Sequence, residues 1–516
     1  MPVVSAEEYA VTVHAADNVA VLKKDVQAGT VMQFSNHILS AKGDIAAGNR
    51  IALLDIAKGS SVLQYGQPIG TSLGIAVGDP VSHANMNDDI PQVRTIPANL
   101  LTPPPDYIPE AKRATFSGFR RSDGRVGTRN SILVIPTSMC ASHEALQISM
   151  LAEFTFFNRG KYPNVDGISA IPHNKGCGCQ NGEPVEILLR VLSNYADHPN
   201  VGGVVLLELG CEKTNLSVVE HYLQRLGRKV NKPLVRIGIQ EVGGTQAAIH
   251  AGLKAVEEML PQVNALRREQ VSVSELVLGV KCGGSDAFSG ISANPSLGHA
   301  SDMLIRSGGT VLITEVPEFC GAEHILAQRA KDADTARQVY QMVDWYKEYA
   351  GKWGANLEEN PSPGNIKGGL LNITIKALGA IAKAGTTRVE GVTDYGTPPN
   401  GKGLFLMQGP GYDQESTPGL VAAGATVVVF TTGRGSTIGN AITPVIKLAS
   451  NNDVFQRMSG DIDLSAGDVL EEKASVTEIG ENVFEHIVNV ASGEPAKAEM
   501  LKHREFQVWA GSAVSL

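Results

Sequence analysis

The chain has 516 residues, of which 43% are hydrophobic and 19% are charged, so it is a globular protein too long for one ordinary domain. Its 44 basic and 53 acidic residues give a net charge of −9, which argues against a general nucleic-acid binder. Met1–Val13 lacks the basic and apolar regions of a signal peptide, and no apolar run is long enough to span a bilayer. With six cysteines, these features predict a cytoplasmic protein with reduced thiols.

The predicted fold class is α/β, with a small β-domain before a large α/β region. Residues 11–88 alternate short β-prone runs with glycine turns, which predicts the β-domain. Residues 89–113 are polar and rich in proline, which indicates a semi-rigid linker or a strap packed across the second domain. Beyond them, alternating strands and helices indicate parallel sheets in two Rossmann-like lobes, residues 114–271 and 272–516, the latter including a C-terminal segment.

The α/β region has strands and helices that the sequence pattern places. We expect strands at Ser131–Pro136, Gly167–Pro172, Gly203–Leu209, Leu234–Ile239, Leu276–Val280, Thr310–Glu315, Gly403–Gln408 and Thr426–Thr431. We expect helices at Glu183–Tyr195, Leu216–Leu226, Ala247–Arg268 and Asp334–Tyr349. The polar helix ending near Gln270 is the expected boundary between the lobes.

The turn Lys281–Gly290 lies between an expected strand and a helix that begins near Ala293. Open α/β sheets bind ligands at the carboxyl ends of their strands, and glycines there let the backbone approach a ligand. Ser285 and Asp286 are therefore candidate substrate contacts.

Four cysteines follow expected strands: Cys140, Cys177, Cys211 and Cys282. If the strands are parallel, the thiols face one edge and could bind a soft metal or an iron–sulfur cluster. The alternative is ordinary burial, since free cysteine is among the most buried residues. A structural zinc site is disfavoured because the paired Cys-x-x-Cys spacing is absent.

Polar loops follow three other expected elements. Glu315 and Glu318 are candidate general bases or metal ligands, or acids that complement a helix dipole. Asn360–Gly369 resembles an anion-holding loop with Lys367 and Asn365, and Thr432, Gly433 and Arg434 form a turn suited to capture of a carboxylate. His14 and His83, in the β-domain, are either solvated or able to contact a ligand on the large region.

Several different short motifs lie one after another along nearly the whole chain. They are Val13–Ala20, Tyr65–Gly70, Gly124–Asn130, Gly210–Glu212, Cys282–Asp286, Ala293–Pro295, Asn360–Asn365 and Thr432–Gly435. In these motifs the chain resembles the altronate/galactarate dehydratase family of bacterial sugar-acid enzymes. The resemblance implies an N-terminal β-clip (SAF-type) domain and an α/β catalytic region. It also implies removal of water from a hexonate or hexarate to give a 2-keto-3-deoxy acid, with a divalent metal, usually Fe²⁺ for the altronate enzyme.

The motifs that would indicate the substrate resemble two different branches of this family. Glu315–Glu318 and Gly409–Asp413 look like the altronate branch, whereas Tyr162–Gly167 and Lys376–Gly379 look like the galactarate branch. His173–Cys179 departs from both. We expect an altronate dehydratase, with galactarate dehydratase as the alternative. A related sulfo-lyase acting on a sulfonated hydroxy acid is disfavoured, because its two regions are separate chains.

The resemblance and the residues together give a hypothetical mechanism. Some of the four thiols bind the metal or cluster, and Arg434 and Lys367 hold the substrate carboxylate. His14, carried by the β-domain, or Glu315 is the acid or base. A thiol-based metal or redox carrier is the non-enzymatic alternative, but it has no need of Arg434 and Lys367. We expect a homo-oligomer, a dimer, whose partner is a small sugar acid and neither nucleic acid nor a membrane.

Overall fold

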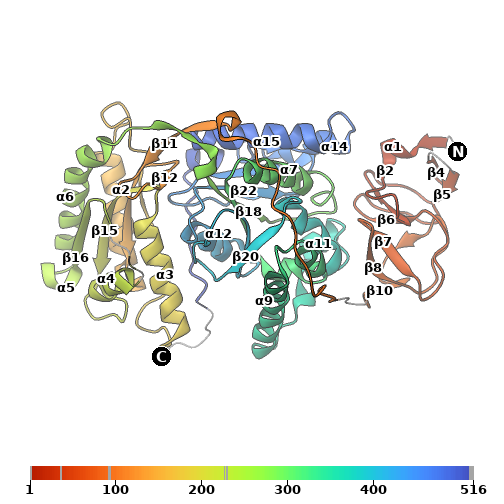
Figure 1. Ribbon diagram of the computed structural model, residues 1–516, viewed down its shortest axis with the longest axis horizontal. Coiled ribbons are helices and arrows are strands. Elements are labelled where there is room, and N and C mark those ends of the chain that lie inside the picture. Colours follow the sequence, from red (N-terminus) through yellow and green to blue (C-terminus); the bar gives the residue numbers. More distant parts are fainter. Residues whose placement is uncertain (1–2, 35–37, 91–93, 226, 228–229, 511–516) are drawn as a thin grey trace.

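The structure is a computed structural model that describes residues 3–34, 38–90, 94–225, 227 and 230–510. The predicted α/β class is confirmed: a small β-domain precedes two larger bodies built on parallel sheets (Figure 1). Within the described residues, no helix combines the length and apolar character needed to cross a membrane.

The β-domain consists of short strands joined by similar corners. Its elements are β1 (Val3–Ser5), α1 (Ala6–Tyr9), β2 (Ala10–Val11), β3 (Val19–Leu22), β4 (Val31–Gln33), β5 (Ile38–Ser40), β6 (Arg50–Ala52), β7 (Ser61–Gln64), β8 (Gln67–Ser72), β9 (Pro80–Val81) and β10 (Met86–Asn87). The strands form the sheets β2-β3-β6-β9, β10-β8-β7 and β1-β4-β5. At the corners, the carboxylates of Asp25, Asp44 and Asp55 each accept a backbone N–H from a neighbouring corner at 2.8 Å.

The proline-rich segment packs along the second lobe. Arg94 pairs with Glu323 at 2.9 Å, and the backbone of Thr102 and Ile108 donates to carbonyls of that lobe at 3.1 and 2.7 Å. Of the two alternatives for this segment, the structure therefore favours the strap. Residues 91–93 of the predicted linker lie outside the described residues.

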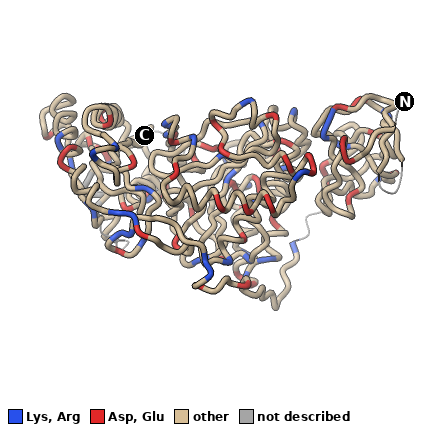
Figure 2. Tube along the Cα trace, turned by 90° about the horizontal axis from the view of Figure 1, so that it is seen from above, with Lys and Arg blue, Asp and Glu red and all other residues tan. Residues whose placement is uncertain are grey.

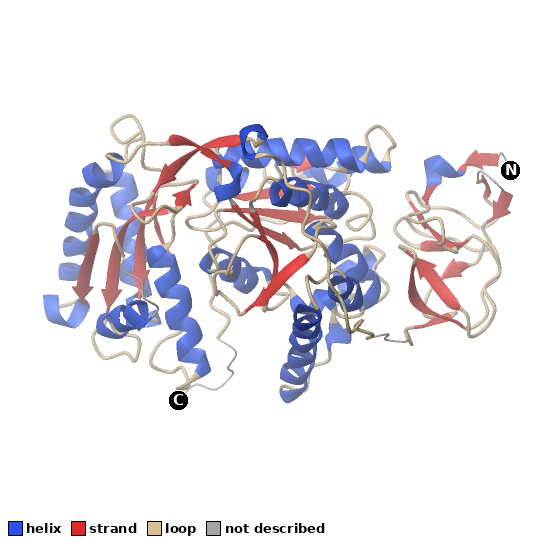
Figure 3. Ribbon diagram, viewed as in Figure 1, coloured by secondary structure: helices blue, strands red, loops and turns tan. Residues whose placement is uncertain are grey.

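The first lobe is a parallel sheet with strand order β14-β13-β15-β16. Its strands are β13 (Ser131–Pro136), β14 (Ile168–Ala170), β15 (Val201–Glu208) and β16 (Leu234–Gly238), and its helices are α2 (Ser142–Thr155), α3 (Glu183–Asp197), α4 (Leu216–Arg225), α5 (Ile239–Val242) and α6 (Thr245–Asn264). Ile132 and Val134 pack toward α2 and α6, whereas Leu133 and Ile135 pack toward α3. Helices thus cover both faces, which explains the continuously apolar strands (Figure 3).

The predicted lobe boundary was wrong in its secondary structure. Helix α6 ends at Asn264, and Glu269–Ser272 is a strand, β17, that pairs antiparallel with β11 (Thr115–Arg120) next to β12 (Val126–Gly127). Val271 is buried between exposed or half-buried neighbours, which is the alternation of a strand rather than of a helix.

The second lobe is a parallel sheet with strand order β20-β21-β19-β18-β22-β23-β24. Its strands are β18 (Val277–Cys282), β19 (Thr310–Ile313), β20 (Val389–Thr393), β21 (Gly403–Met407), β22 (Val427–Thr432), β23 (Val445–Ala449) and β24 (Leu464–Ser465). Its helices are α7 (Ala293–Arg306), α8 (Glu323–Gln328), α9 (Ala333–Lys352), α10 (Pro363–Lys367), α11 (Ile373–Ala380), α12 (Asp413–Ala422), α13 (Asn452–Arg457), α14 (Gly467–Leu470), α15 (Val476–Ala491) and α16 (Lys497–Met500). α7 and α15 lie on one side of the sheet and α12 on the other (Figure 1).

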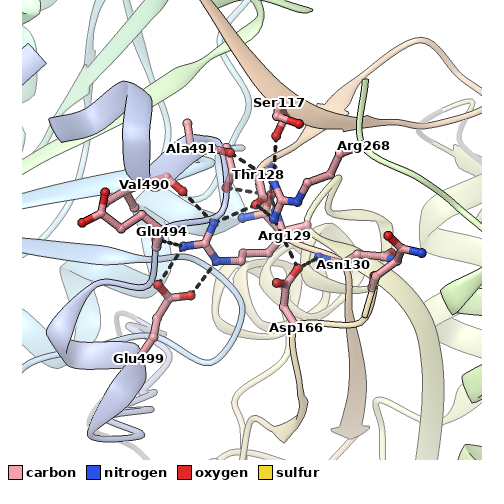
Figure 4. A network of polar contacts seen from close by, with 12 residues as sticks. Ser117, Thr128, Arg129, Asn130, Asp166, Arg268, Val490, Ala491, Glu494 and Glu499 are labelled. Carbon is pink, nitrogen blue, oxygen red and sulfur yellow. Dashed lines mark hydrogen bonds and ion pairs between the residues drawn. The ribbon is translucent and has the colours of Figure 1, made fainter. Parts of the chain in front are cut away.

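Arg129 joins the two lobes. Its guanidinium forms two bonds with the Glu499 carboxylate, at 2.7 and 2.8 Å, and donates to the carbonyls of Thr128, Val490 and Glu494 at 2.8 Å each (Figure 4). Burial opposes the charge of this guanidinium, but Glu499 outweighs it and raises its pKa. The motif Gly124–Asn130 therefore connects the two lobes.

Candidate functional site

The carboxyl end of the second-lobe sheet carries a buried set of lysines and carboxylates. Elsewhere, charged residues of both signs are scattered along the trace (Figure 2). Here Lys281, Glu315 and Lys383 have fully buried side chains. Glu315 adopts a left-handed backbone conformation with φ of 76°, which is uncommon for a residue other than glycine and turns the chain sharply after β19.

Lys281 is the centre of one half of this network. Its Nζ lies 2.5 Å from Glu315 Oε1 and 2.6 Å from Asp413 Oδ1. Burial works against the charge on Lys281, but Asp413 and Glu315 outweigh it and raise the pKa of the ammonium. Asp413 has a side chain that is 27% exposed, so it connects the buried network to solvent.

Cys282 is the centre of the other half. Its Sγ donates to Glu318 Oε2 at 2.9 Å and accepts from Lys383 Nζ at 3.0 Å, while Lys376 lies 2.8 Å from Glu318 Oε1. Burial, reinforced by Glu318, raises the pKa of the Cys282 thiol. Burial also disfavours the charge on Glu318, but Lys376 and Lys383 outweigh it and lower the pKa of this carboxyl to about 2.

Cys282, Glu315 and Glu318 form a possible metal-binding triad. One ligand atom of each lies within 4.8 Å of the others, and a thiol with two carboxylates is consistent with a divalent metal. However, Lys383 Nζ lies 3.0, 3.2 and 3.7 Å from atoms of these same three side chains. Its ammonium takes the position that a cation would need, so the triad does not fit a metal ion while Lys383 stays there.

The glycine turn after β18 pairs with the turn after β22. Gly433 donates its N–H to Gly284 O at 3.1 Å, and a Cβ on Gly433 would lie 2.1 Å from Asp286 Cγ. Asp286 accepts hydrogen bonds from Ser289, Ser450 and Asn451, and these bonds fix the conformation of the turn. Burial raises the pKa of its carboxyl.

The predicted substrate residues are brought together around this turn. The Asn365 amide donates to Ser285 O at 2.8 Å, and the buried Ser285 hydroxyl is left with no hydrogen-bond partner among the described residues. Thr432 Oγ1 accepts from the backbone of Gly435 at 3.0 Å, which shapes the loop that carries Arg434.

Arg434 and Lys367 are exposed at the edge of the site. Arg434 Nε lies 3.9 Å from the position of a Cβ on Gly364, in the loop that opens α10. Among the described residues neither cation forms an ion pair, so both are available to an anion. A hollow of about 400 Å³ lies beside Tyr412, the residue before Asp413, and is lined by Pro317, Asn360, Gly411, Tyr412 and aromatic side chains of α9.

His14 lies on the β-domain near its contact with the second lobe. It is exposed, its Nδ1 accepts from Ala16 N at 3.1 Å, and Gly66 makes room for its ring. The adjoining Tyr65 is half-buried, with its hydroxyl packed against Gly290, and loss of solvation there raises the pKa of that hydroxyl to about 12. The β-domain thus docks directly on the glycine turn.

The four predicted thiols do not share one edge. Cys140, Cys177 and Cys211 follow β13, β14 and β15 and are exposed, whereas Cys282 ends β18 and is buried. The expectation of a single four-thiol edge was wrong because these strands belong to two separate sheets.

Lys376, Lys383 and Asp413 were not predicted as site residues. Lys376 and Lys383 lie on α11 and the turn that follows it, in a run that reads as an apolar helix. Two lysines within such a run signal buried charge, because lysine is almost never fully buried without a partner.

Three family models cover most of the chain and confirm the resemblance seen in the motifs. The Altronate/galactarate dehydratase SAF domain matches residues 8–89. The D-galactarate dehydratase/Altronate hydrolase second domain matches residues 118–264. The D-galactarate/Altronate dehydratase C-terminal model matches residues 273–514.

Curated relatives cover the chain to different extents. The altronate dehydratase of Bacillus subtilis is 34% identical over 97% of this chain and 98% of its own. The galactarate dehydratase (L-threo-forming) of Escherichia coli is 34% identical over 94% of this chain and 93% of its own. The (2R)-sulfolactate sulfo-lyase subunit beta of Chromohalobacter salexigens is 35% identical, but its match covers only 77% of this chain and 97% of its own.

Proposed function

The chain belongs to the altronate/galactarate dehydratase family, and on that premise we propose that it is a hydro-lyase that dehydrates a sugar acid, with altronate as the preferred substrate. The observation that carries the proposal is that an exposed Arg434, which forms no ion pair with any described residue, lies at the same sheet edge as a buried Lys–carboxylate network. A sugar acid needs both a site for its carboxylate and groups that move protons.

The reaction removes the C2 proton and the C3 hydroxyl of a 2,3-dihydroxy acid. The resulting enol then takes a proton at C3 and becomes the 2-keto-3-deoxy acid. The C2 proton is weakly acidic because a carboxylate stabilises an enolate poorly. The site must therefore supply a base, an acid for the leaving hydroxide, and positive charge for the intermediate.

Asp413 is the base in this proposal, because it is the part of the buried network that reaches solvent. Lys281, 2.6 Å behind it, supplies positive charge. Glu315 was expected to act directly, but its side chain is fully buried, so we assign it to positioning Lys281. His14 remains the proposed acid, brought to the site by the docked β-domain.

Arg434 binds the substrate carboxylate through two parallel hydrogen bonds, in a bidentate pair, and Lys367 adds positive charge nearby. The Ser285 hydroxyl, which lacks a partner among the described residues, is free to bind a substrate hydroxyl. Thr432, Gly433, Asp286 and Asn365 hold these groups in place.

The proposed cofactor is iron, as Fe²⁺ or within an iron–sulfur cluster. When bound, iron supplies Lewis acidity toward the substrate oxygens. Cys282, Glu315 and Glu318 are the donors that converge among the described residues, and they could hold such an ion only if the Lys383 ammonium moved away from them. We also propose a homodimer, which light scattering would test.

A product assay tests the proposal. Anaerobic protein supplied with iron is incubated with altronate, galactarate or sulfolactate, and 2-keto-3-deoxy acid and sulfite are measured. We expect keto-acid from altronate at a higher kcat/KM than from galactarate. Sulfite release from sulfolactate would instead support the sulfo-lyase, and no product from any acid would overturn the hydro-lyase assignment.

A further inference from the structure

Helix α2 of the first lobe is apolar on two faces. Ile148 and Ala152 are buried in the core that α2 shares with the sheet and with α6. Leu146, Met150 and Phe154, spaced four residues apart, form an outer stripe and are 38%, 61% and 93% exposed. A surface helix ordinarily carries polar side chains on its outer face, and a helix that is apolar all round is normally buried. The sequence of α2 is therefore that of a helix covered on both sides, whereas the described residues cover only one.

Exposed apolar side chains are concentrated at this helix. Among the described residues, five of the eighteen exposed large apolar side chains lie within residues 139–154. Besides the stripe they are Met139, just before α2, and Leu151. Together the five expose roughly 500 Å² of apolar surface, which is near the upper end of the largest patch on an ordinary monomer. A patch of this size usually marks a surface that binds another molecule.

The apolar surface continues onto α16 near the end of the chain. Met500, the last residue of α16, is 67% exposed. Glu153 on α2 pairs with Lys502 at 3.3 Å and with Arg504 at 3.1 Å, which holds the two segments together. A hollow of about 550 Å³ lies between them and has Glu153, Phe157 and Met500 in its lining. We define the α2 face as the six exposed residues Met139, Leu146, Met150, Leu151, Phe154 and Met500.

The charges around the α2 face favour a second copy of this chain over a charged partner. Helix α2 has two carboxylates and no lysine or arginine. Glu144 is buried and accepts a hydrogen bond from the Thr245 hydroxyl at 2.8 Å, and Glu153 is paired with Lys502 and Arg504. A two-fold contact brings a surface against itself, so any unpaired charge would meet its like. The six residues of the α2 face are all apolar, so they neither oppose such a contact nor attract a charged partner.

The size and shape of the surface also suit a contact between copies. A stable interface buries about 800 Å² on each partner, and homodimer interfaces are more apolar than transient ones. The patch on α2 supplies roughly 500 Å² of that area, and Met500 with the rim of the hollow can supply the rest. Phe154 protrudes from the same face that contains the hollow. A protruding side chain and a recess on one surface give the self-complementary contact that a two-fold axis requires.

We propose that the α2 face is the interface of a homodimer. Helix α2 of one copy packs against α2 of the other about a two-fold axis, and Phe154 of each copy enters the hollow beside α2 of its partner. This contact buries the outer stripe of α2 and so gives the helix the second apolar environment that its sequence requires. The proposal concerns association alone and does not depend on the proposed function.

Sedimentation velocity of the full chain over a range of concentrations tests the proposal. We expect the wild type to sediment as a dimer, and Phe154→Glu and Met500→Glu as monomers, because each variant places a charge in an apolar contact. Phe154→Ser removes the ring without adding charge and should raise the dissociation constant of the dimer at least about tenfold. Leu54→Glu changes a β-domain side chain that is 50% exposed, and as the matched control it should remain a dimer.

The side chains changed in these variants are exposed, so melting temperatures should match that of the wild type and show that each variant folds. A wild type that stays monomeric at every concentration would overturn the proposal. A dimer that Phe154→Glu and Phe154→Ser leave intact, or one that Leu54→Glu also dissociates, would overturn it as well. A dimer that Phe154→Glu dissociates but Met500→Glu does not would contradict entry of Phe154 into the hollow and leave only the contact between the two α2 helices.

Discussion

Lys383 Nζ lies 3.0 Å from Cys282 Sγ, although the two residues are 101 positions apart in the sequence and both are buried. The ammonium therefore completes a cage of one thiol and two carboxylates. The cage shows why a donor set that suits a metal does not by itself establish one, since a lysine satisfies the same groups.

Replacing this lysine should be costly. We expect Lys383→Met to lower the free energy of unfolding by about 3–5 kcal/mol, because it leaves buried carboxylates without their partner. Denaturant unfolding measures the change. Lys112→Met, at an exposed position, is the matched control and should stay within about 0.5 kcal/mol. Stability equal to the wild type would show that the cage is not an ion-pair network.

Arg434 should affect activity and not stability. A hydrogen bond to a charged group is worth about 1.5–3 kcal/mol, so Arg434→Gln should lower kcat/KM roughly 10- to 100-fold. Arg434→Lys should recover part of the loss, because lysine keeps the charge but not the two-pronged geometry. Arg457→Gln, also exposed, is the control. Unchanged kcat/KM in Arg434→Gln would remove this residue from the site.

Asp413→Asn should lower kcat by about 10²- to 10⁴-fold, the usual contribution of a positioned general base. The side chain keeps its size and much of its hydrogen bonding, so the protein should still fold and bind substrate. Steady-state kinetics on altronate distinguish a loss of kcat from a rise in KM. A rise in KM with normal kcat would make Asp413 a binding residue instead.

The β-domain takes part in catalysis only if His14 is the general acid. We expect His14→Ala to reduce kcat at least about tenfold, as loss of a general acid would. His83→Ala changes the other β-domain histidine near the second lobe, whose Nε2 lies 3.0 Å from Leu371 O, and should have a smaller effect. Normal turnover in His14→Ala would limit the β-domain to a structural role.

His173 should make stability depend on pH. Its Nε2 faces Pro136 O and its Nδ1 accepts from Lys175 N, so a proton on Nδ1 would face a donor. Burial lowers the pKa of this histidine from 6.5 to about 4. The unfolded chain therefore binds a proton that the folded chain excludes, and the stabilisation is complete above pH 6.5 and is lost as the pH falls toward about 4.

Denaturation midpoints measured between pH 7 and about 4 test this dependence. His173→Gln should flatten the curve, whereas His250→Gln, at an exposed position, should leave it as in the wild type. A curve of unchanged slope in His173→Gln would mean that other groups cause the acid sensitivity.

Local pattern predicted the strands, the glycine turns and the division into two lobes, but not how the edges of the two sheets lie relative to one another. Ser131–Pro136 falls in the first predicted lobe and Leu276–Val280 in the second. The expectation of one thiol edge rested only on all four cysteines following expected strands, and the structure places Cys282 on a separate sheet. The sequence predicts a helix that ends near Gln270, where the structure has the strand Glu269–Ser272, because the pairing of that strand with Thr115–Gly118 depends on residues far away in the chain.

The site residues also divide into those that local sequence predicts and those that depend on contacts between distant parts of the chain. Arg434, Ser285 and Asn365 lie at strand and helix ends that the sequence marks, and the structure brings them together. The position of Lys383 in an apolar run signals a buried charge but not its partners, which come from β18 and the turn after β19. Long-range ion pairs of this kind are visible only once the chain is folded.

Mass spectrometry of the reaction in heavy water tests the central claim most directly. Anaerobic protein supplied with iron and altronate should give a product that has lost one water and gained one solvent deuterium at C3. That result follows from an enol that takes its C3 proton from solvent. Recovery of altronate unchanged in mass, with the protein folded and loaded with iron, would contradict the assignment of this chain as a sugar-acid dehydratase.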